Sequence, residues 1–168
     1  MKNYINIKKR REALDTLNKF KEKNYNMQIV RLDNVELRKI NNYLMHTVFK
    51  HNDLYVDANT LFEIMQPVGK QGKHNYHGLS PETVIGSLKK IAYPYCIFED
   101  GIQKYAVITS EMSKNNQPIM IVIAIETDTR TNIVKEINKI VTMFPKNDVD
   151  SFLKNMPQEK ILYKSVFK

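Results

Sequence analysis

The chain has a single cysteine, Cys96, among its 168 residues. An internal disulfide is therefore excluded, and a zinc site built on paired cysteines is disfavoured because the partner thiols do not exist. The lone thiol lies in an apolar run, which predicts a small core residue rather than a nucleophile. The sequence also lacks an uncharged run long enough to cross a bilayer, and its first 23 residues are too charged for the apolar core of a secretion signal. These absences predict a cytoplasmic protein with no membrane contact.

The residue sets of three common active sites are also missing. Residues 69–74 (GKQGKH) look like a phosphate loop, but Pro67 stands where that loop needs glycine and His74 where it needs Ser or Thr. The histidines have no further ligands at metal spacing, and the acidic residues do not group as they do in a two-metal nuclease. We therefore expect no metal and no cofactor.

Positive charge is in excess, and most of it lies in the first third of the chain. The formal net charge is +8, and residues 1–50 carry 12 Lys and Arg against 5 Asp and Glu. Lys9, Arg10 and Arg11 stand together in this part. Such a cluster favours binding to an RNA backbone or to an acidic protein. The alternative is a solvated helix face, which is the commoner outcome for a run of charges.

Residues 1–66 are predicted to form a mostly helical N-terminal region. Apolar residues at helical spacing indicate helices over residues 5–23, 33–49 and 57–65. Weak alternation over residues 26–32 favours a strand.

Residues 67–168 are predicted to form an antiparallel sheet with packed helices. One helix begins at Ser80, which can cap it, and Pro94 stops it. Residues 132–142 fit either a strand or a short helix. The other expected elements are strands over residues 95–98, 103–110, 118–125 and 160–167, and a helix from Asp148 or Asp150 through Met156. This order of elements is typical of the α+β class, in one compact unit.

His77 is the candidate residue for chemistry. It stands just ahead of a predicted helix N-terminus, a place that favours an anion such as a phosphate, and its imidazole titrates near neutral pH. A lone histidine beside a helix cap is more often a packing residue, and spacing alone leaves both readings open. The residues that could cover, position or neutralise a phosphate are Lys70, Lys73, His74, Thr142, Lys146, Tyr163 and Lys164.

The order of several short segments resembles a known family. The segments are HGLSPE (77–82), YPY (93–95), AVITSE (106–111), QPIMIVIAIE (117–126), INKIVTMFPKND (137–148) and ILYKS (161–165). Together they resemble phage MuF-type C-terminal domains, members of the barnase–EndoU–colicin–RelE-like superfamily of small ribonucleases. The resemblance covers roughly residues 68–168.

The resemblance implies a metal-independent endoribonuclease. In such enzymes the 2′-hydroxyl of RNA attacks the adjacent phosphate and leaves a cyclic phosphate. His77 would be the acid or base, Thr142 and Tyr163 would orient or bond the phosphate, and Lys146 and Lys164 would stabilise its charge. The chain departs from the pattern where a proline precedes Lys146 in place of glycine, and residues 1–65 have no counterpart in the family.

Three hypotheses follow. The first is an endoribonuclease of a phage or mobile element, either a toxin with an antitoxin or immunity protein, or an anti-CRISPR protein that acts on guide RNA. The second is a non-catalytic module that binds RNA or a host ribonucleoprotein through its sheet and its basic N-terminal helix. The third is a structural protein of a virion, without salt-sensitive affinity for nucleic acid.

Overall fold

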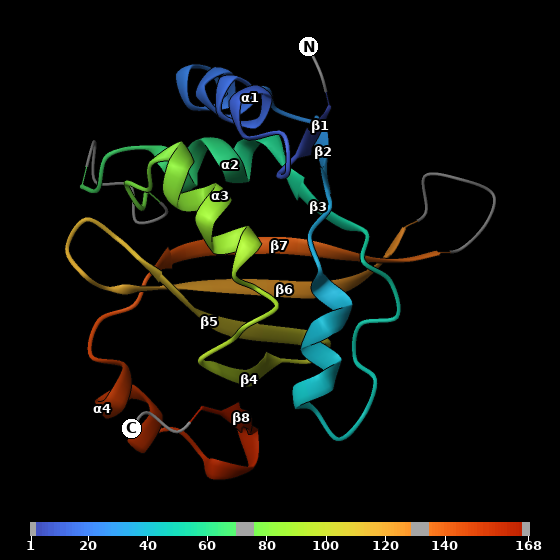
Figure 1. Cartoon of the computed structure of the whole chain (residues 1–168), viewed down its shortest axis with the longest axis vertical. Helices are drawn as coiled ribbons and strands as arrows, with labels where there is room; N and C mark the ends of the chain where they lie inside the picture. Colours follow the sequence, from blue (N-terminus) through green and yellow to red (C-terminus); the bar gives the residue numbers. More distant parts are fainter. Residues whose placement is uncertain (1–2, 70–75, 129–134, 166–168) are drawn as a thin grey trace.

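The computed structural model describes residues 3–69, 76–128 and 135–165, and these form one sheet with helices on both of its faces (Figure 1). The strands are β1 (Tyr4–Asn6), β2 (Ile29–Asp33), β3 (Leu54–Asp57), β4 (Cys96–Gly101), β5 (Lys104–Met112), β6 (Pro118–Asp128), β7 (Lys135–Pro145) and β8 (Ile161–Lys164). The helices are α1 (Arg10–Glu22), α2 (Ala58–Met65), α3 (Pro81–Lys89), α4 (Val149–Lys154) and the 3₁₀ helices η1 (Leu37–Tyr43) and η3 (Gln158–Lys160). The predicted α+β class is confirmed.

The order of the strands across the sheet is β1-β2-β3-β7-β6-β5-β4-β8. From β7 to β8 every neighbouring pair is antiparallel, as the sequence predicts. The N-terminal region adds three more strands, and β3 joins the rest of the sheet by a parallel pairing with β7. Residues 3–66 and the later sheet are therefore parts of one hydrogen-bonded structure.

The predicted helix over residues 33–49 was too long. Only η1 is helical, and the chain then turns back over an extended segment. The Asn41 side chain accounts for this, because its oxygen accepts hydrogen bonds from the backbone N–H groups of Val48 (2.9 Å) and Phe49 (3.0 Å), while its amide donates to the Phe49 carbonyl (2.7 Å). These bonds compete with the helical ladder and hold a loop instead.

The sequence analysis does not predict strand β3. Residues 54–57 alternate between buried and half-buried positions, which is the pattern of a strand, but four residues are too few to stand out from the helix that follows. The ambiguous segment over residues 132–142 is a strand where it is described, since β7 pairs with β6 from Lys135 to Pro145.

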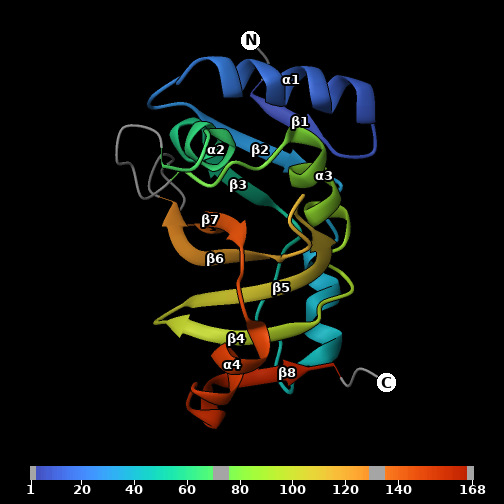
Figure 2. The same cartoon turned by 90° about the vertical axis from the view of Figure 1, so that its left-hand side faces the viewer.

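The two faces of the sheet carry separate apolar cores. Val107 and Ile121 point to the face covered by α1, α2, α3 and η1, whereas Ala106 and Val122 point to the face where α4 packs. Figure 2 shows α1 at one end of the molecule and α4 with β8 at the other. This arrangement separates the N-terminal and C-terminal ends of the sheet.

Candidate functional site

His77 is held in place through its own backbone and that of the next two residues. The N–H of His77 donates to the Glu63 carbonyl (3.3 Å), that of Gly78 to the Gln66 carbonyl (2.7 Å), and that of Leu79 to the Ile64 carbonyl (3.0 Å). These carbonyls belong to the last turn of α2 and the residue after it, where a helix leaves acceptors unsatisfied. Gly78 has a φ of +68°, a conformation that glycine adopts without strain. The end of α2 therefore fixes where the imidazole lies.

Thr142 comes to His77 from the other side, on β7. The pairing of β3 with β7 runs only as far as Ile140, and the register between β6 and β7 shifts between Val122 and Ile123. Beyond this point the Thr142 hydroxyl lies 3.2 Å from His77 Nε2. The imidazole also packs beside the ring of Phe144, at 5.4 Å between centroids. Two segments 65 residues apart in sequence thus meet at one imidazole–hydroxyl pair.

The environment of His77 favours the uncharged imidazole. Its side chain is half-buried, and this desolvation lowers its pKa from the ordinary value of 6.5. A neutral imidazole has one nitrogen with a free lone pair, so the ring can accept a proton at neutral pH. The Thr142 hydroxyl can donate to that lone pair, or accept from the ring N–H in the other tautomer.

His77 lines two cavities. The smaller cavity has a volume of about 370 Å³ and is lined by Thr142, Glu63 and Thr60. The Glu63 carboxylate accepts a hydrogen bond from the Asn59 side-chain amide (3.2 Å). The other, of about 650 Å³, is lined by Lys21, Lys114 and several hydroxyl and amide groups. The arrangement places a proton acceptor between a hydroxyl–carboxylate wall and a basic wall, a combination suited to chemistry on an anionic substrate.

The structure does not bring Tyr163 and Lys164 to this pair. Both lie on β8, four strands from β7 and roughly 19 Å away at the ordinary spacing of strands. The Tyr163 ring packs against Tyr43, with 4.7 Å between centroids. Lys164 lines a different cavity, of about 690 Å³, together with Asp150.

Among the other predicted basic residues that the structure describes, Lys146 contacts an aromatic ring and the remaining three lie on the surface. The Lys146 ammonium stands over the Phe152 ring of α4, at 3.9 Å. Lys9, Arg10 and Arg11 are exposed at the start of α1, about 16 Å along the helix axis from Lys21. Lys70, Lys73 and His74 lie outside the described residues.

Sequence reasoning missed Lys21, Glu63 and Lys114. Lys21 looks like any charge on the polar side of an amphipathic helix, and Glu63 like a solvated residue of α2. Lys114 lies in a polar turn between two predicted strands, where a lysine carries no special signal. Only the packing of α1, α2 and the β5–β6 turn around residues 77–83 reveals them.

Cys96 is a core residue, as predicted. It is fully buried in β4, and this desolvation raises the pKa of its thiol to about 11. Within the described residues, no three or more His, Cys, Asp or Glu side chains gather closely enough to hold a metal ion. No helix in the described part of the chain is both long and apolar enough to span a bilayer.

Comparison with known protein families gives a match over most of the C-terminal part of the chain. The model of the phage MuF-C-terminal domain family matches residues 69–168. The matched segment includes both His77 and Thr142 but not Lys21 or Glu63. No curated protein and no solved structure matches the chain.

Proposed function

The chain belongs to the phage MuF-C-terminal domain family over residues 69–168, and we propose that it is an endoribonuclease that cuts RNA without a metal ion. The observation that carries the proposal is the His77–Thr142 pair, at 3.2 Å, between two cavities. The lowered pKa of His77 supports it, because a general base must be unprotonated at the working pH.

The proposed reaction is an internal transesterification. With Nε2–H of His77 donating to the Thr142 hydroxyl, the other ring nitrogen, Nδ1, takes the proton of a ribose 2′-hydroxyl, the O2′–P bond forms, and the P–O5′ bond breaks. The 5′-oxygen takes a proton from water, and His77 returns its proton to solvent, so the products are a 2′,3′-cyclic phosphate and a 5′-hydroxyl. Thr142 orients the imidazole through their hydrogen bond. Because Tyr163 and Lys164 lie four strands away, the proposal assigns them no contact with the reacting phosphate.

A cleavage assay in excess EDTA tests this proposal. The substrates are structured RNAs, including a CRISPR guide RNA, whose selective cleavage would support a counter-defence role. We expect discrete products that end in cyclic phosphate, and a loss of at least about 100-fold in rate for His77→Ala. His51→Ala, which removes an exposed histidine, is the control. Equal cleavage by the two variants, or intact RNA with every substrate, would contradict the enzyme proposal.

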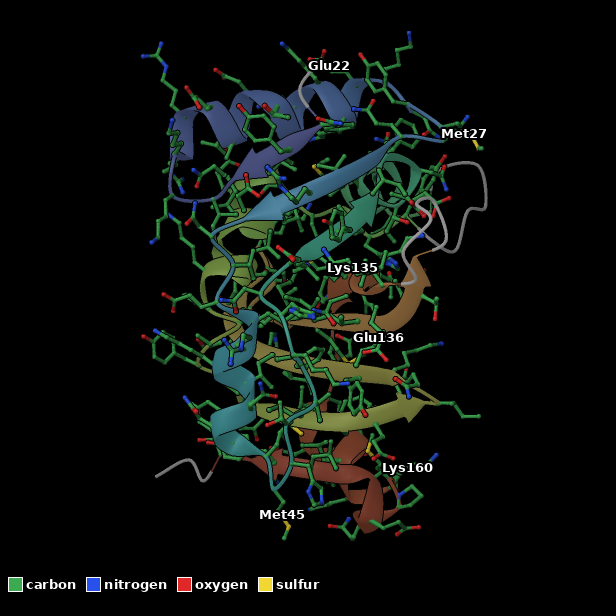
Figure 3. All side chains as sticks on the ribbon, turned by 90° about the vertical axis from the view of Figure 1, so that its right-hand side faces the viewer. Glu22, Met27, Met45, Lys135, Glu136 and Lys160 are labelled. Atoms are coloured by element: carbon green, nitrogen blue, oxygen red, sulfur yellow. The ribbon has the colours of Figure 1, made fainter. Side chains whose placement is uncertain are left out.

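A second candidate function, RNA binding without cleavage, is favoured by a row of residues across β1, β2, β3 and β7. Tyr4 pairs in register with Arg31, Arg31 with Tyr55, and Tyr55 with Lys139. Their neighbours along the strands face the core beneath α1 and α2, so this row occupies the opposite face. Figure 3 looks onto β2 and β3 from the side opposite to α2. The two aromatic rings on this face are suited to stacking bases, while Arg31 and Lys139 are already ion-paired with Asp33 (2.7 Å) and Asp57 (2.8 Å).

Substitution in this row tests the second candidate. Tyr55→Ala should weaken the binding of single-stranded RNA by about 1–3 kcal/mol, because a stacking platform is lost. Fluorescence anisotropy against salt concentration measures it, and Tyr93→Ala, which removes an exposed tyrosine elsewhere in the chain, is the control. An affinity that is unchanged by Tyr55→Ala would rule out this face as the binding surface.

A further inference from the structure

The larger of the two cavities beside His77 is lined by five segments of the chain, and its polar groups come from three of them, the other two being the end of α2 and Pro145. Lys21 reaches it from the last turn of α1, His77 and Ser80 from the segment that enters α3, and Lys114 from the turn between β5 and β6. Lys21 and the end of α2 lie outside the part of the chain that the family model matches, whereas the other three segments lie inside it. The N-terminal region thus supplies one wall of a cavity that the family-matched part leaves open.

The backbone that carries each lysine is fixed by hydrogen bonds. The Gln66 side-chain amide donates to the Lys21 carbonyl (2.7 Å), which ties the end of α1 to the end of α2. In the β5–β6 turn, the Ser113 hydroxyl accepts from the N–H groups of Asn115 (3.2 Å) and Gln117 (3.3 Å), and the Ser113 N–H donates to the Gln117 carbonyl (2.8 Å). The backbone from which each lysine side chain extends is therefore ordered before a ligand binds, which limits the entropy lost on binding.

The charge of the cavity has one sign. Its described lining contains Lys21, Lys114 and His77, with hydroxyl groups from Ser80, Thr83 and Ser113, and no carboxylate among the described residues. Neither lysine forms an ion pair with a described carboxylate, in contrast to Lys90 with Glu111 (2.8 Å) and Lys139 with Asp57 (2.8 Å). Two unneutralised ammonium groups beside hydroxyl and amide donors are suited to a phosphate.

We propose that this cavity binds the phosphate of the RNA nucleotide adjacent to the scissile bond. The inference rests on the proposed function, since it takes the His77–Thr142 pair as the place of cleavage. The volume of about 650 Å³ lies in the range of pockets that bury a small molecule. One strand of RNA could then lie with its reacting phosphate at His77 and the next phosphate between Lys21 and Lys114. These two lysines act on substrate binding rather than on the proton transfer.

A binding experiment with uncleaved RNA tests the cavity independently of cleavage. The probe is a short fluorescein-labelled single-stranded RNA of mixed sequence, and every variant also carries His77→Ala. We expect Lys21→Ala and Lys114→Ala each to raise Kd about tenfold at low salt, as one phosphate contact is lost, and to reduce the slope of log K against log salt by about 0.7. Lys19→Ala, which removes an exposed lysine from the same helix outside the cavity, is the matched control.

Lys114→Arg keeps the charge, so it should bind within about twofold of the unsubstituted protein. Thermal unfolding of each variant shows that a change in affinity does not come from misfolding. In the cleaving protein, Lys21→Ala should raise KM and leave kcat largely unchanged.

The failure of this inference differs from the failure of the proposed function. If Lys21→Ala and Lys114→Ala weaken binding no more than Lys19→Ala does, the cavity is not the phosphate site, even if His77 is required for cleavage. If the two lysines matter for binding but no RNA is cut, the proposed function fails while the phosphate site stands. The affinity for a DNA strand of the same sequence shows which part of the nucleotide is recognised. Equal binding of DNA and RNA would mean that the cavity binds any phosphodiester. Weaker binding of DNA would mean that the protein also contacts the ribose 2′-hydroxyl.

Discussion

His77 combines two properties that a surface histidine does not have. Its backbone is tied to the end of α2, and its ring is half-buried between Thr142 and Phe144. Burial disfavours the imidazolium, which explains why its pKa falls below the ordinary value. Burial would lower the pKa of a histidine that only packs in the same way. The pH dependence of activity and that of stability therefore have to be measured together.

The lowered pKa of His77 predicts that stability falls with falling pH. Above the ordinary pKa of 6.5 the imidazole is neutral in both the folded and unfolded chains and has no effect. Below it, the unfolded chain binds a proton that the folded chain resists until its own lower pKa is reached, so the free energy of unfolding decreases across that window. Urea unfolding between about pH 8 and about pH 5 measures this.

His77→Gln should remove this part of the pH dependence, whereas His51→Gln, at an exposed position, should not. The rate of RNA cleavage should fall with acid through the same lowered pKa, because protonated His77 cannot accept the 2′-hydroxyl proton. Equal pH slopes for the two variants would show that His77 is not the titrating group.

At the scale of elements, α3 is the helix that the sequence specifies most fully. Ser80 is its N-cap, and the Ser80 hydroxyl accepts from the Thr83 N–H (3.1 Å), with Pro81 in the first turn as expected. Gly86 lies in the middle of α3, and the sequence alone does not explain why glycine occupies this position. A Cβ added there would lie 2.5 Å from Glu111 Cδ on β5, so the missing side chain lets the helix approach the sheet.

Two effects of Gly86→Ala should nearly cancel. Alanine stabilises a helix interior by about 1 kcal/mol relative to glycine. Against this, the methyl group must displace the Glu111 carboxylate, which is ion-paired with Lys90 at 2.8 Å. We expect the free energy of unfolding to change by less than about 1 kcal/mol.

In the background of Glu111→Ala the obstacle is gone, so the same Gly86→Ala substitution should stabilise the protein by about 1 kcal/mol. Urea unfolding of the two single variants and the double variant measures this coupling. Equal effects of Gly86→Ala in both backgrounds would show that α3 and β5 do not approach each other as described.

At the scale of the whole molecule, the N-terminal region and the family-matched region share one core. Leu54 and Val56 of β3 are fully buried together with Val84 and Ile85 of α3. The β3–β7 pairing lies near the middle of the sheet, so removing residues 1–66 would expose both an edge of β7 and the apolar surface beneath α1 and α2.

This sharing predicts a single unfolding transition. Leu54→Ala should lower the free energy of unfolding by about 2–5 kcal/mol, because it removes buried apolar volume at the junction. The near-UV signals of tyrosines and the far-UV signal of the backbone should shift to the same new midpoint. Two separate transitions, with only one of them shifted, would mean that residues 1–66 and 67–168 unfold independently.

The sequence by itself determined the elements whose signals are local. The cap and periodicity of α3, the apolar run of β6, the burial of Cys96 and the α+β class all follow from residues close together in the chain. Such signals reflect backbone conformation, capping and amphipathic spacing, which act over a few residues. The position of His77 beside a helix N-terminus was therefore predictable.

Only the tertiary structure decided which side chains meet. Spacing in the sequence cannot show that Thr142 lies 3.2 Å from His77, that Lys21 lines the neighbouring cavity, or that Tyr163 lies four strands away, because these follow from the order of strands across the sheet. The same applies to β7, whose sequence fits a helix or a strand until its pairing with β6 settles it. Strand order depends on contacts between distant segments, so it is fixed by the packing of the whole chain rather than by local preference.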